Sequence, residues 1–203
     1  MVYPIARYTV APLLRLFIRK VDGLNNLPKP PFIIAANHES FLDPFLILAV
    51  TLPLIDQKIH YLAMKGRFWN LFGDGISRHW AGCVPLDEGK QNALTELADI
   101  LSNGGIVGIF PGGPRSLDGR LTKGKTGAVR LALETKVPIV PVGLIGTFNI
   151  APDNTLIPRP RRANIRFGKP IYYNTKNPNL KNLTSDLMAK IADLADKQYL
   201  YNE

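Results

Sequence analysis

The stretch that decides the fold is PFIIAANHESFLDPFLILAV, residues 31–50. Its first part, 31–37, is a continuous apolar run of strand length, which is typical of a strand buried on both faces of a parallel sheet. Its last part, 44–50, begins with Pro directly after Asp43 and stays apolar, as at the start of a buried helix. A buried strand that leads into a helix predicts an α/β fold, whose sites lie at the carboxyl ends of such strands.

The same alternation of strands and helices continues outward from this stretch. The 89–104 segment, for example, repeats its apolar residues with a 3.6-residue period and ends on Gly104, as a helix does. Further strands are expected at 59–64, 83–86, 105–110, 137–145 and 163–168, and further helices at 67–72, 126–136 and 183–200. We therefore expect a mixed, largely parallel sheet flanked by helices, in a single α/β domain over residues 27–203.

The composition indicates a globular protein with an anionic partner. Of the 203 residues 46% are hydrophobic, and the net charge is +9. Such a charge fits a nucleic acid, an anionic membrane surface or a phosphorylated substrate. No nucleic-acid motif is present, and aromatic residues do not alternate with the basic ones, so we expect no nucleic-acid partner. The single Cys83 excludes an intramolecular disulfide.

Residues 1–26 form a separate N-terminal segment in this interpretation. The stretch YPIARYTVAPLLRLFIRK, 3–20, is rich in aromatic and aliphatic residues, is interrupted by basic ones, and contains no acid. An apolar helix with basic residues can lie in the interface plane of a membrane. It can equally pack on the core with its arginines in solvent, and the segment alone leaves both readings open. No uninterrupted apolar run reaches the ~18 residues of a spanning helix.

A phosphate-binding motif occurs at GRLTKGKT, 119–126, which matches the Walker pattern G-x-x-x-x-G-K-T. A P-loop needs a buried strand that ends at its first glycine, but the preceding strand is expected to end near Phe110. An apolar strand ending in Asp, which would supply the metal-binding carboxylate, does not follow. The surroundings therefore argue against a P-loop NTPase, although the loop and Lys125 at a helix start still favour an anion site.

The residues best suited to catalysis are His38 and Asp43 in NHESFLDP, 37–44. A turn between them can bring the carboxylate to one imidazole nitrogen and leave the other as a general base. The alternative is a turn histidine and a helix-capping aspartate. His60 and His79 are interpreted as strand and surface residues. The chain lacks the clustered ligands of a zinc site, so we expect no metal. It also lacks the G-x-S-x-G motif, which argues against a serine hydrolase.

Several blocks in this order resemble the glycerolipid acyltransferase family, whose bacterial members include the 1-acyl-sn-glycerol-3-phosphate acyltransferases. The pattern N-H-x-S-x-x-D is matched at 37–43, and F-P-E-G-T-R-S is matched in part by FPGGPRS, 110–116. The strand VPIVPV, 137–142, is intact, and KTGAV from Lys125 resembles the family's K-x-G-A helix start, which accounts for the Walker match. The resemblance covers roughly residues 20–170.

The resemblance implies a role for each matched residue. His38 takes the proton from an acceptor hydroxyl that attacks an acyl thioester, and Asp43 orients His38. Backbone N–H groups near Gly112 and Gly113 stabilise the oxyanion. Arg115 holds the acceptor phosphate, with Lys125 and Lys65 adding positive charge. The expected substrate-binding residues are Asn37, Ser40, Lys65, Gly112, Gly113, Arg115, Ser116 and Lys125.

Two departures from the family pattern concern the acceptor. Gly112 and Pro114 replace the family's Glu and Thr, and in GCVPLDE, 82–88, Glu88 stands where Arg is usual. These changes leave three hypotheses: an acyltransferase acting on 1-acyl-sn-glycerol-3-phosphate, the same chemistry on a lysolipid or amine without a terminal phosphate, or a catalytically degenerate lipid-binding protein. Restoring Arg at 88 and Glu at 112 tests the second.

The family implies substrates and a membrane rather than a bound cofactor. The donor is acyl-CoA or acyl-carrier protein, and the acceptor is a lysophospholipid. Because a lysolipid lies in the bilayer, the N-terminal segment is now expected to dock monotopically on an anionic membrane surface at its cytoplasmic face. The sequence does not fix the oligomeric state or the acyl chain length.

Overall fold

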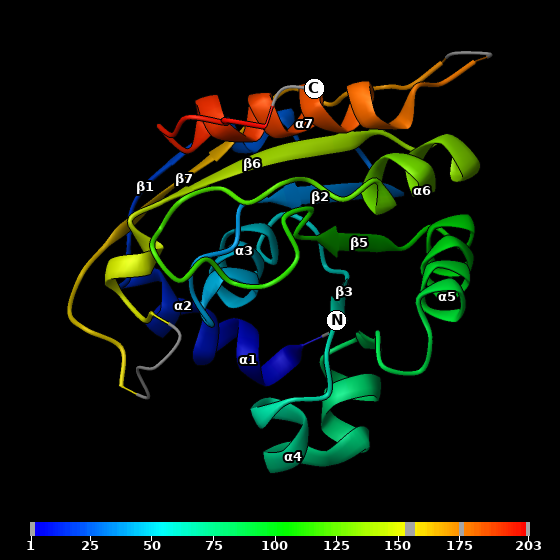
Figure 1. The fold of residues 1–203 in the computed structure, drawn as a ribbon. Helices are drawn as coiled ribbons and strands as arrows, with labels where there is room; N and C mark the ends of the chain where they lie inside the picture. Colours follow the sequence, from blue (N-terminus) through cyan, green and yellow to red (C-terminus); the bar gives the residue numbers. More distant parts are fainter. Residues whose placement is uncertain (1–2, 153–156, 175–176, 202–203) are drawn as a thin grey trace.

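The computed structural model describes residues 3–152, 157–174 and 177–201 as one seven-stranded sheet flanked by helices (Figure 1). The strand order is β1-β7-β6-β2-β5-β3-β4, and every pair is parallel except β6–β7. This confirms the predicted mixed, largely parallel sheet. The strands are β1 Ile18–Asp22, β2 Phe32–Ala36, β3 Ile59–Ala63, β4 Cys83–Pro85, β5 Ile106–Ile109, β6 Ile139–Ile145 and β7 Ala163–Phe167.

Helices cover both faces of the sheet, so the core has two layers. Ile33 and Ala35 of β2 pack with residues of α5, α6 and α7, whereas Phe32, Ile34 and Ala36 of the same strand pack with α3. All five side chains are buried, which explains why β2 reads as an unbroken apolar run. The α-helices are α1 Pro4–Tyr8, α2 Val10–Arg15, α3 Asp43–Thr51, α4 Arg67–Asp74, α5 Lys90–Ser102, α6 Gly127–Thr135 and α7 Leu180–Leu194, with short helical turns η1 Leu24–Asn26, η2 Gly75–Trp80 and η3 Thr147–Asn149.

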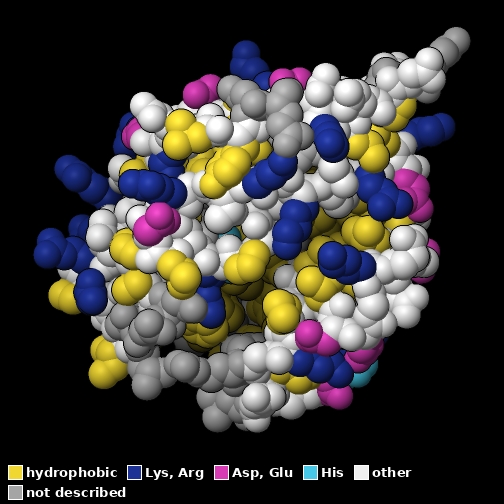
Figure 2. Space-filling model, in the orientation of Figure 1, with side chains coloured by type: hydrophobic (Ala, Val, Ile, Leu, Met, Phe, Trp, Pro, Cys, Tyr) yellow, Lys and Arg dark blue, Asp and Glu magenta, His cyan; other side chains and the backbone are white. Residues whose placement is uncertain are grey.

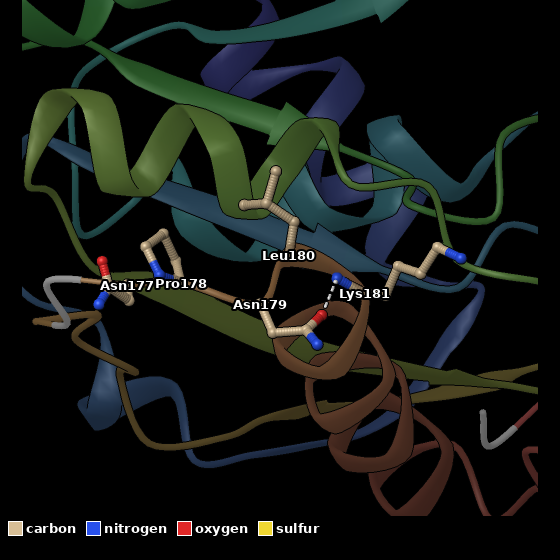
Figure 3. A pocket seen from close by; sticks show the side chains of 5 residues that line it. All are labelled: Asn177, Pro178, Asn179, Leu180 and Lys181. Atoms are coloured by element: carbon tan, nitrogen blue, oxygen red, sulfur yellow. Dashed lines mark hydrogen bonds between the residues drawn. The ribbon is translucent and has the colours of Figure 1, made fainter.

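Each strand and helix predicted from residue 31 onward is present, but the last helix is shorter at its end than predicted. α7 ends at Leu194, because Asp196 adopts a left-handed conformation (φ 54°) and the Lys197 N–H donates to the Ala192 carbonyl at 2.9 Å. That pairing is a Schellman stop, for which the residue at 196 is Asp rather than the usual Gly. The helix starts at Leu180, where the Asn179 side chain accepts hydrogen bonds from the Asn182 N–H and from the Lys181 N–H, the latter drawn in Figure 3. The shallow surface depression at 177–181 contains none of the predicted site residues.

The N-terminal segment differs from a purely helical one, because 18–22 form the edge strand β1. Strand β1 runs parallel to β7, and Phe17, Ile18 and Val21 pack against the core while Arg19 and Lys20 are exposed. Successive side chains of a strand alternate between faces, and a register shift between Ile18 and Lys20 lets both Ile18 and Val21 pack against the core. The boundary expected at residue 26 therefore falls inside the sheet domain.

The helices α1 and α2 combine the two readings of the segment. Tyr3 and Ala11 are buried against Ala49 and Leu52 of the α3 region. Other apolar side chains of these helices, and Leu16 directly after α2, are exposed; those on the helices are Ile5, Tyr8, Val10 and Leu13. None of the described helices is both long and apolar enough to cross a membrane. The segment thus packs on the core with one face and offers a second apolar face to its surroundings.

Candidate active site

The turn between β2 and α3 holds the predicted catalytic pair. His38 Nδ1 lies 2.8 Å from Asp43 Oδ2, and the Asp43 side chain is fully buried. The same oxygen accepts the backbone N–H groups of Glu39 at 2.7 Å and Ser40 at 2.8 Å. Because a carboxylate only accepts hydrogen bonds, it assigns the proton to Nδ1 and leaves Nε2 as the basic nitrogen. The turn thereby leaves His38 Nε2 free of the Asp43 contact and able to accept a proton.

An aromatic stack supports the imidazole ring from below. The His38 and Phe110 rings are parallel within 13° with centroids 3.9 Å apart, and Phe110 in turn stacks on Tyr61 of β3 at 5.7 Å. Gly108 of β5 makes room for Tyr61, since a Cβ there would lie 2.1 Å from the Tyr61 ring. Burial raises the pKa of Tyr61, so this ring is a neutral part of the stack. The ring of His38 is therefore fixed on two sides, by a carboxylate and by a packed aromatic column.

Asn37 and Ser40 hold the turn from within the protein. The Asn37 side chain makes two hydrogen bonds with the Leu144 backbone of β6, at 2.8 Å and 2.7 Å. The Ser40 hydroxyl accepts from the Leu42 N–H at 3.2 Å, and both Asn37 and Ser40 are buried. These contacts give both residues a role in shaping the turn, while their direct contact with substrate stays a prediction.

The loop after β5 lies against this turn. The Ser116 N–H donates to the His38 carbonyl at 2.9 Å, and the Lys125 N–H donates to the Pro111 carbonyl at 2.8 Å. Gly113 has φ 84°, and a Cβ there would lie 2.6 Å from Lys125 Nζ. The structure therefore places Ser116 against His38 and Lys125 against Gly113, in the loop that also carries the half-buried Arg115.

A hollow opens beside these residues. Figure 2 shows it between α1 and the loop after β5, lined mainly by hydrophobic side chains, with lysine and arginine side chains near its rim. A smaller cavity on the inner side of the loop is lined by His38, Gly112, Ser116 and Met188 of α7, among others. An apolar hollow with basic groups at the rim suits a ligand that has a hydrocarbon part and an anionic part.

Comparison with known proteins identifies the family. The family model Acyltransferase matches residues 18–145. The chain belongs to this acyltransferase family. It is 33% identical over 141 residues to a chloroplastic 1-acyl-sn-glycerol-3-phosphate acyltransferase of Brassica napus, with 66% of this chain and 39% of that protein covered.

Two further comparisons extend over most of the chain. A 1-acyl-sn-glycerol-3-phosphate acyltransferase of Saccharomyces cerevisiae is 32% identical over 187 residues, which cover 88% of this chain and 56% of that protein. The chain thus spans about two fifths to just over half the length of these relatives. The crystal structure of the 1-acyl-sn-glycerophosphate acyltransferase of Thermotoga maritima superposes with a TM-score of 0.71 at 22% identity, covering 94% and 81% of the two chains. That likeness shows the same α/β fold.

The departure at Glu88 is explained by an ion-pair cluster. Glu88 lies 2.8 Å from Lys65 Nζ and 3.1 Å from Arg78, which also binds Glu96 at 2.9 Å. A hydrogen bond from Lys65 lowers the pKa of Glu88, and the same bond raises the pKa of Lys65. All these side chains are substantially exposed. Lys65 is therefore paired with Glu88, where the acyltransferase pattern usually has a second cation.

The departure at Gly112 is filled by a neighbour. The Thr122 hydroxyl donates to the Gly112 carbonyl at 3.0 Å. A Cβ at position 112 would lie 2.4 Å from the Thr122 hydroxyl oxygen. A glutamate at this position, as in most acyltransferases of the family, has to displace the hydroxyl. The loop thus compensates for the missing side chain with a local hydrogen bond.

Sequence reasoning missed one charged pair near the site. Glu39, in the middle of the active-site turn, is 2% exposed and lies 2.8 Å from Lys197, which follows α7. Nothing in the motif marks Glu39, because it occupies a variable position of N-H-x-S-x-x-D. Its burial became visible only when the fold placed the end of α7 beside the turn. Among the described residues, no group of three His, Cys, Asp or Glu side chains is arranged to hold a metal ion.

Proposed function

We propose that this acyltransferase moves a fatty acyl group from a thioester donor, acyl-CoA or acyl-carrier protein, to the hydroxyl of 1-acyl-sn-glycerol-3-phosphate, giving phosphatidate. The observation that carries the proposal is the 2.8 Å contact between His38 Nδ1 and the buried Asp43, beside an apolar hollow. The names of the Brassica and Saccharomyces relatives support this acceptor.

The proposed reaction is a direct transfer. His38 Nε2 removes the proton from the acceptor hydroxyl while its oxygen attacks the thioester carbonyl carbon. Asp43 stabilises the imidazolium that forms. The tetrahedral intermediate then collapses by breaking the carbon–sulfur bond, and the thiolate takes the proton from His38. The products are the ester and the free thiol, and no acyl-enzyme forms.

The loop after β5 supplies the other groups that this reaction needs. Gly113 N–H already donates to the Phe110 carbonyl at 2.9 Å. The Gly112 N–H is therefore the better donor for the oxyanion of the intermediate. Arg115 and Lys125, in the same loop, are proposed to bind the acceptor phosphate, and the hollow of Figure 2 is proposed to take the acyl chain.

One observation favours a second candidate acceptor. Glu88 stands where the family pattern usually has Arg, and it also pairs with Lys65, so these positions offer less positive charge to an anionic headgroup than the family pattern does. The second candidate is therefore the same transfer to a lysolipid or amine without a terminal phosphate.

Thiol release from long-chain acyl-CoA and from acyl-carrier protein, measured with a panel of lysolipids, tests the proposal. Faster release with 1-acyl-sn-glycerol-3-phosphate than with lysophosphatidylcholine or monoacylglycerol supports the first acceptor, and mass spectrometry of the product confirms the new ester. Release that prefers an uncharged or zwitterionic acceptor supports the second candidate. No acceptor-dependent release with either donor contradicts both and favours a lipid-binding protein.

We also propose that α1 and α2 dock the enzyme monotopically on an anionic bilayer. Four exposed apolar side chains lie on these helices, and the exposed Leu16 follows directly after α2. Beside them, Ala163 N–H donates to the Phe17 carbonyl at 2.8 Å, which brings the exposed Arg161 and Arg162 next to the end of α2. Apolar side chains inserted into the acyl boundary and arginines near lipid phosphates are the elements of an interfacial anchor.

Vesicle co-sedimentation tests this docking. Replacing Leu13 and Leu16 by Asp should release most of the protein from vesicles that contain anionic lipid, because both leucines are 62% exposed on the proposed face. Leu200→Asp, at a leucine after α7 that is 75% exposed, serves as the control and should leave binding unchanged. Unchanged sedimentation of the Leu13/Leu16 variant contradicts the proposed face.

A further inference from the structure

The end of the chain reaches the active-site turn through Lys197. Its ammonium lies 2.8 Å from Glu39 Oε1 and also donates to the Gly119 carbonyl of the loop after β5. The Lys197 side chain is 21% exposed and that of Glu39 is 2% exposed. The Lys197 ammonium thus connects the segment after α7 with the turn that carries His38 and with the loop after β5.

The fold fixes Lys197 in this position. The left-handed residue Asp196 turns the chain at the end of α7, and its carboxylate binds Arg166 of β7 at 2.5 Å. Gly143 of β6 allows the helix end to approach, since a Cβ there would lie 2.2 Å from the Leu194 backbone. The segment after α7 is therefore attached to β6, whose Leu144 also binds Asn37 of the turn, and to the neighbouring strand β7.

Glu39 passes this attachment on to the catalytic pair. Its Oε1 also accepts from the Asn37 amide at 2.7 Å, and its backbone N–H donates to Asp43 Oδ2 at 2.7 Å. Asp43 Oδ2 is the oxygen that holds His38. If Glu39 moves, its backbone N–H moves with it. Because that N–H donates to Asp43 Oδ2, the carboxylate that contacts His38 is displaced as well.

The electrostatics of Glu39 make it dependent on Lys197. Burial, and to a smaller extent the charge of Asp43, raises the pKa of the Glu39 carboxyl, whereas hydrogen bonds from Lys197 and Asn37 and the Lys197 charge lower it. His38 and Arg120 line the same small cavity as Glu39. The Lys197 ammonium is thus the contact that favours the ionised, accepting form of Glu39 most strongly.

We propose that Lys197 is a positioning residue of the acyltransferase, which holds Glu39 and the loop at Gly119 so that His38 and Asp43 keep their alignment. The family model matches residues 18–145, so Lys197 lies outside the matched part. In this proposal the segment after α7 completes the active site. The inference rests on acyl transfer by His38.

The first arm of the test compares steady-state kinetics of Lys197→Met, Lys197→Arg and Lys190→Met, the last at an exposed lysine on α7. Misalignment of reacting groups should lower kcat of K197M on the order of 10- to 100-fold with KM for the donor changed less than about three-fold. K197R should recover most of kcat, and K190M should match the wild type. Equal kcat in K197M and K190M overturns the proposal.

The second arm uses Glu39→Gln to show that Lys197 acts through Glu39. In K197M the pKa of Glu39 rises further, so the acid limb of the kcat profile should move to higher pH as Glu39 becomes a donor and Asn37 loses its acceptor. In E39Q/K197M no carboxyl remains at 39, and the acid limb should return to the wild-type position. An acid limb that stays in place in K197M, or stays displaced in the double variant, overturns the proposal.

A third measurement does not depend on activity. The His38 ring signals, one set among three histidines, should shift in K197M and recover in K197R, whereas K190M leaves them unchanged. If the wild type releases no thiol, the proposed function fails, and these signals still decide whether Lys197 positions His38. The double variant carries no unpaired buried charge and keeps the test available if K197M does not fold. Unchanged His38 signals in a folded variant contradict the positioning role.

Discussion

The turn that carries His38 and Asp43 and the ion-pair cluster around Lys65 and Glu88 hold their charged residues in opposite ways. Asp43 is fully buried and one of its oxygens accepts three hydrogen bonds, at 2.7–2.8 Å. Glu88 is 46% exposed, and its ion pairs with Lys65 and Arg78 face solvent. A buried group held by hydrogen bonds loses much when one partner changes, whereas exposed ion pairs contribute little and are screened by salt. The His38–Asp43 pair is therefore expected to be sensitive to substitution, whereas the Lys65–Glu88 ion pair is open to variation.

The largest effect is expected at the buried end of this comparison. Asp43→Asn should lower kcat roughly 10³- to 10⁴-fold, because an amide facing His38 no longer assigns the proton to Nδ1 or stabilises the imidazolium. The measurement is single-turnover thiol release from acyl-CoA. Asp99→Asn, on the exposed face of α5, should keep the wild-type rate. Near-normal turnover of D43N would mean that the turn is structural only.

An intermediate effect is expected in the loop between the two regions. Gly113→Ala has to accept φ 84° and a Cβ 2.6 Å from Lys125 Nζ, so both the loop and the ammonium should shift. The strain alone costs roughly 1–2 kcal/mol of unfolding free energy. Gly104→Ala is the matched control, with φ 81° and no atom within 4 Å of the added Cβ.

Comparing the two glycine variants separates strain from function. Both should lose similar stability in urea denaturation, whereas only G113A should raise KM for a phosphate-bearing acceptor. Equal kinetic constants in G113A and G104A would remove Gly113 and Lys125 from the proposed acceptor site.

The smallest effect is expected at the Lys65–Glu88 ion pair. Glu88→Arg breaks two exposed ion pairs and frees Lys65, so KM for 1-acyl-sn-glycerol-3-phosphate should fall a few-fold at low salt and the difference should shrink at high salt. Position 88 is a cleaner probe than position 112, because a side chain at 112 has to displace the Thr122 hydroxyl. Glu134→Arg, exposed on α6, makes the same change of net charge elsewhere.

The direction of the E88R effect distinguishes the two candidate acceptors. A lower KM for the phosphate-bearing acceptor, absent in E134R, indicates that Glu88 has weakened phosphate binding. If E88R lowers activity on every acceptor tested, position 88 does not set acceptor choice. The hypothesis that Glu88 in place of Arg changes the acceptor is then wrong.

The sequence predicted the regions in which local pattern and tertiary role agree. The apolar run 31–37 can only be buried on both faces, and β2 is. The pairing of His38 with Asp43 follows from a five-residue spacing across a strand–helix turn, so local chemistry sufficed.

The features that the sequence did not reveal depend on contacts between distant segments. β1 exists because β7 offers an edge, and a short segment next to basic residues carries too weak a period to show it. The end of α7 depends on a left-handed Asp196, where a glycine would have been the recognisable signal. Glu39 and Lys197 are ordinary charged residues in the sequence, and only the packing of α7 on β6 makes them a buried pair.

The central claim is that His38 is the general base of acyl transfer. The most direct measurement is the acceptor-dependent rate of thiol release from acyl-CoA by His38→Ala, with His79→Ala as the control at an exposed histidine. We predict a loss of at least roughly 10³-fold in H38A with an unchanged melting transition, and a rate within about two-fold of the wild type in H79A. Acceptor-dependent release by H38A at the wild-type rate would contradict this claim.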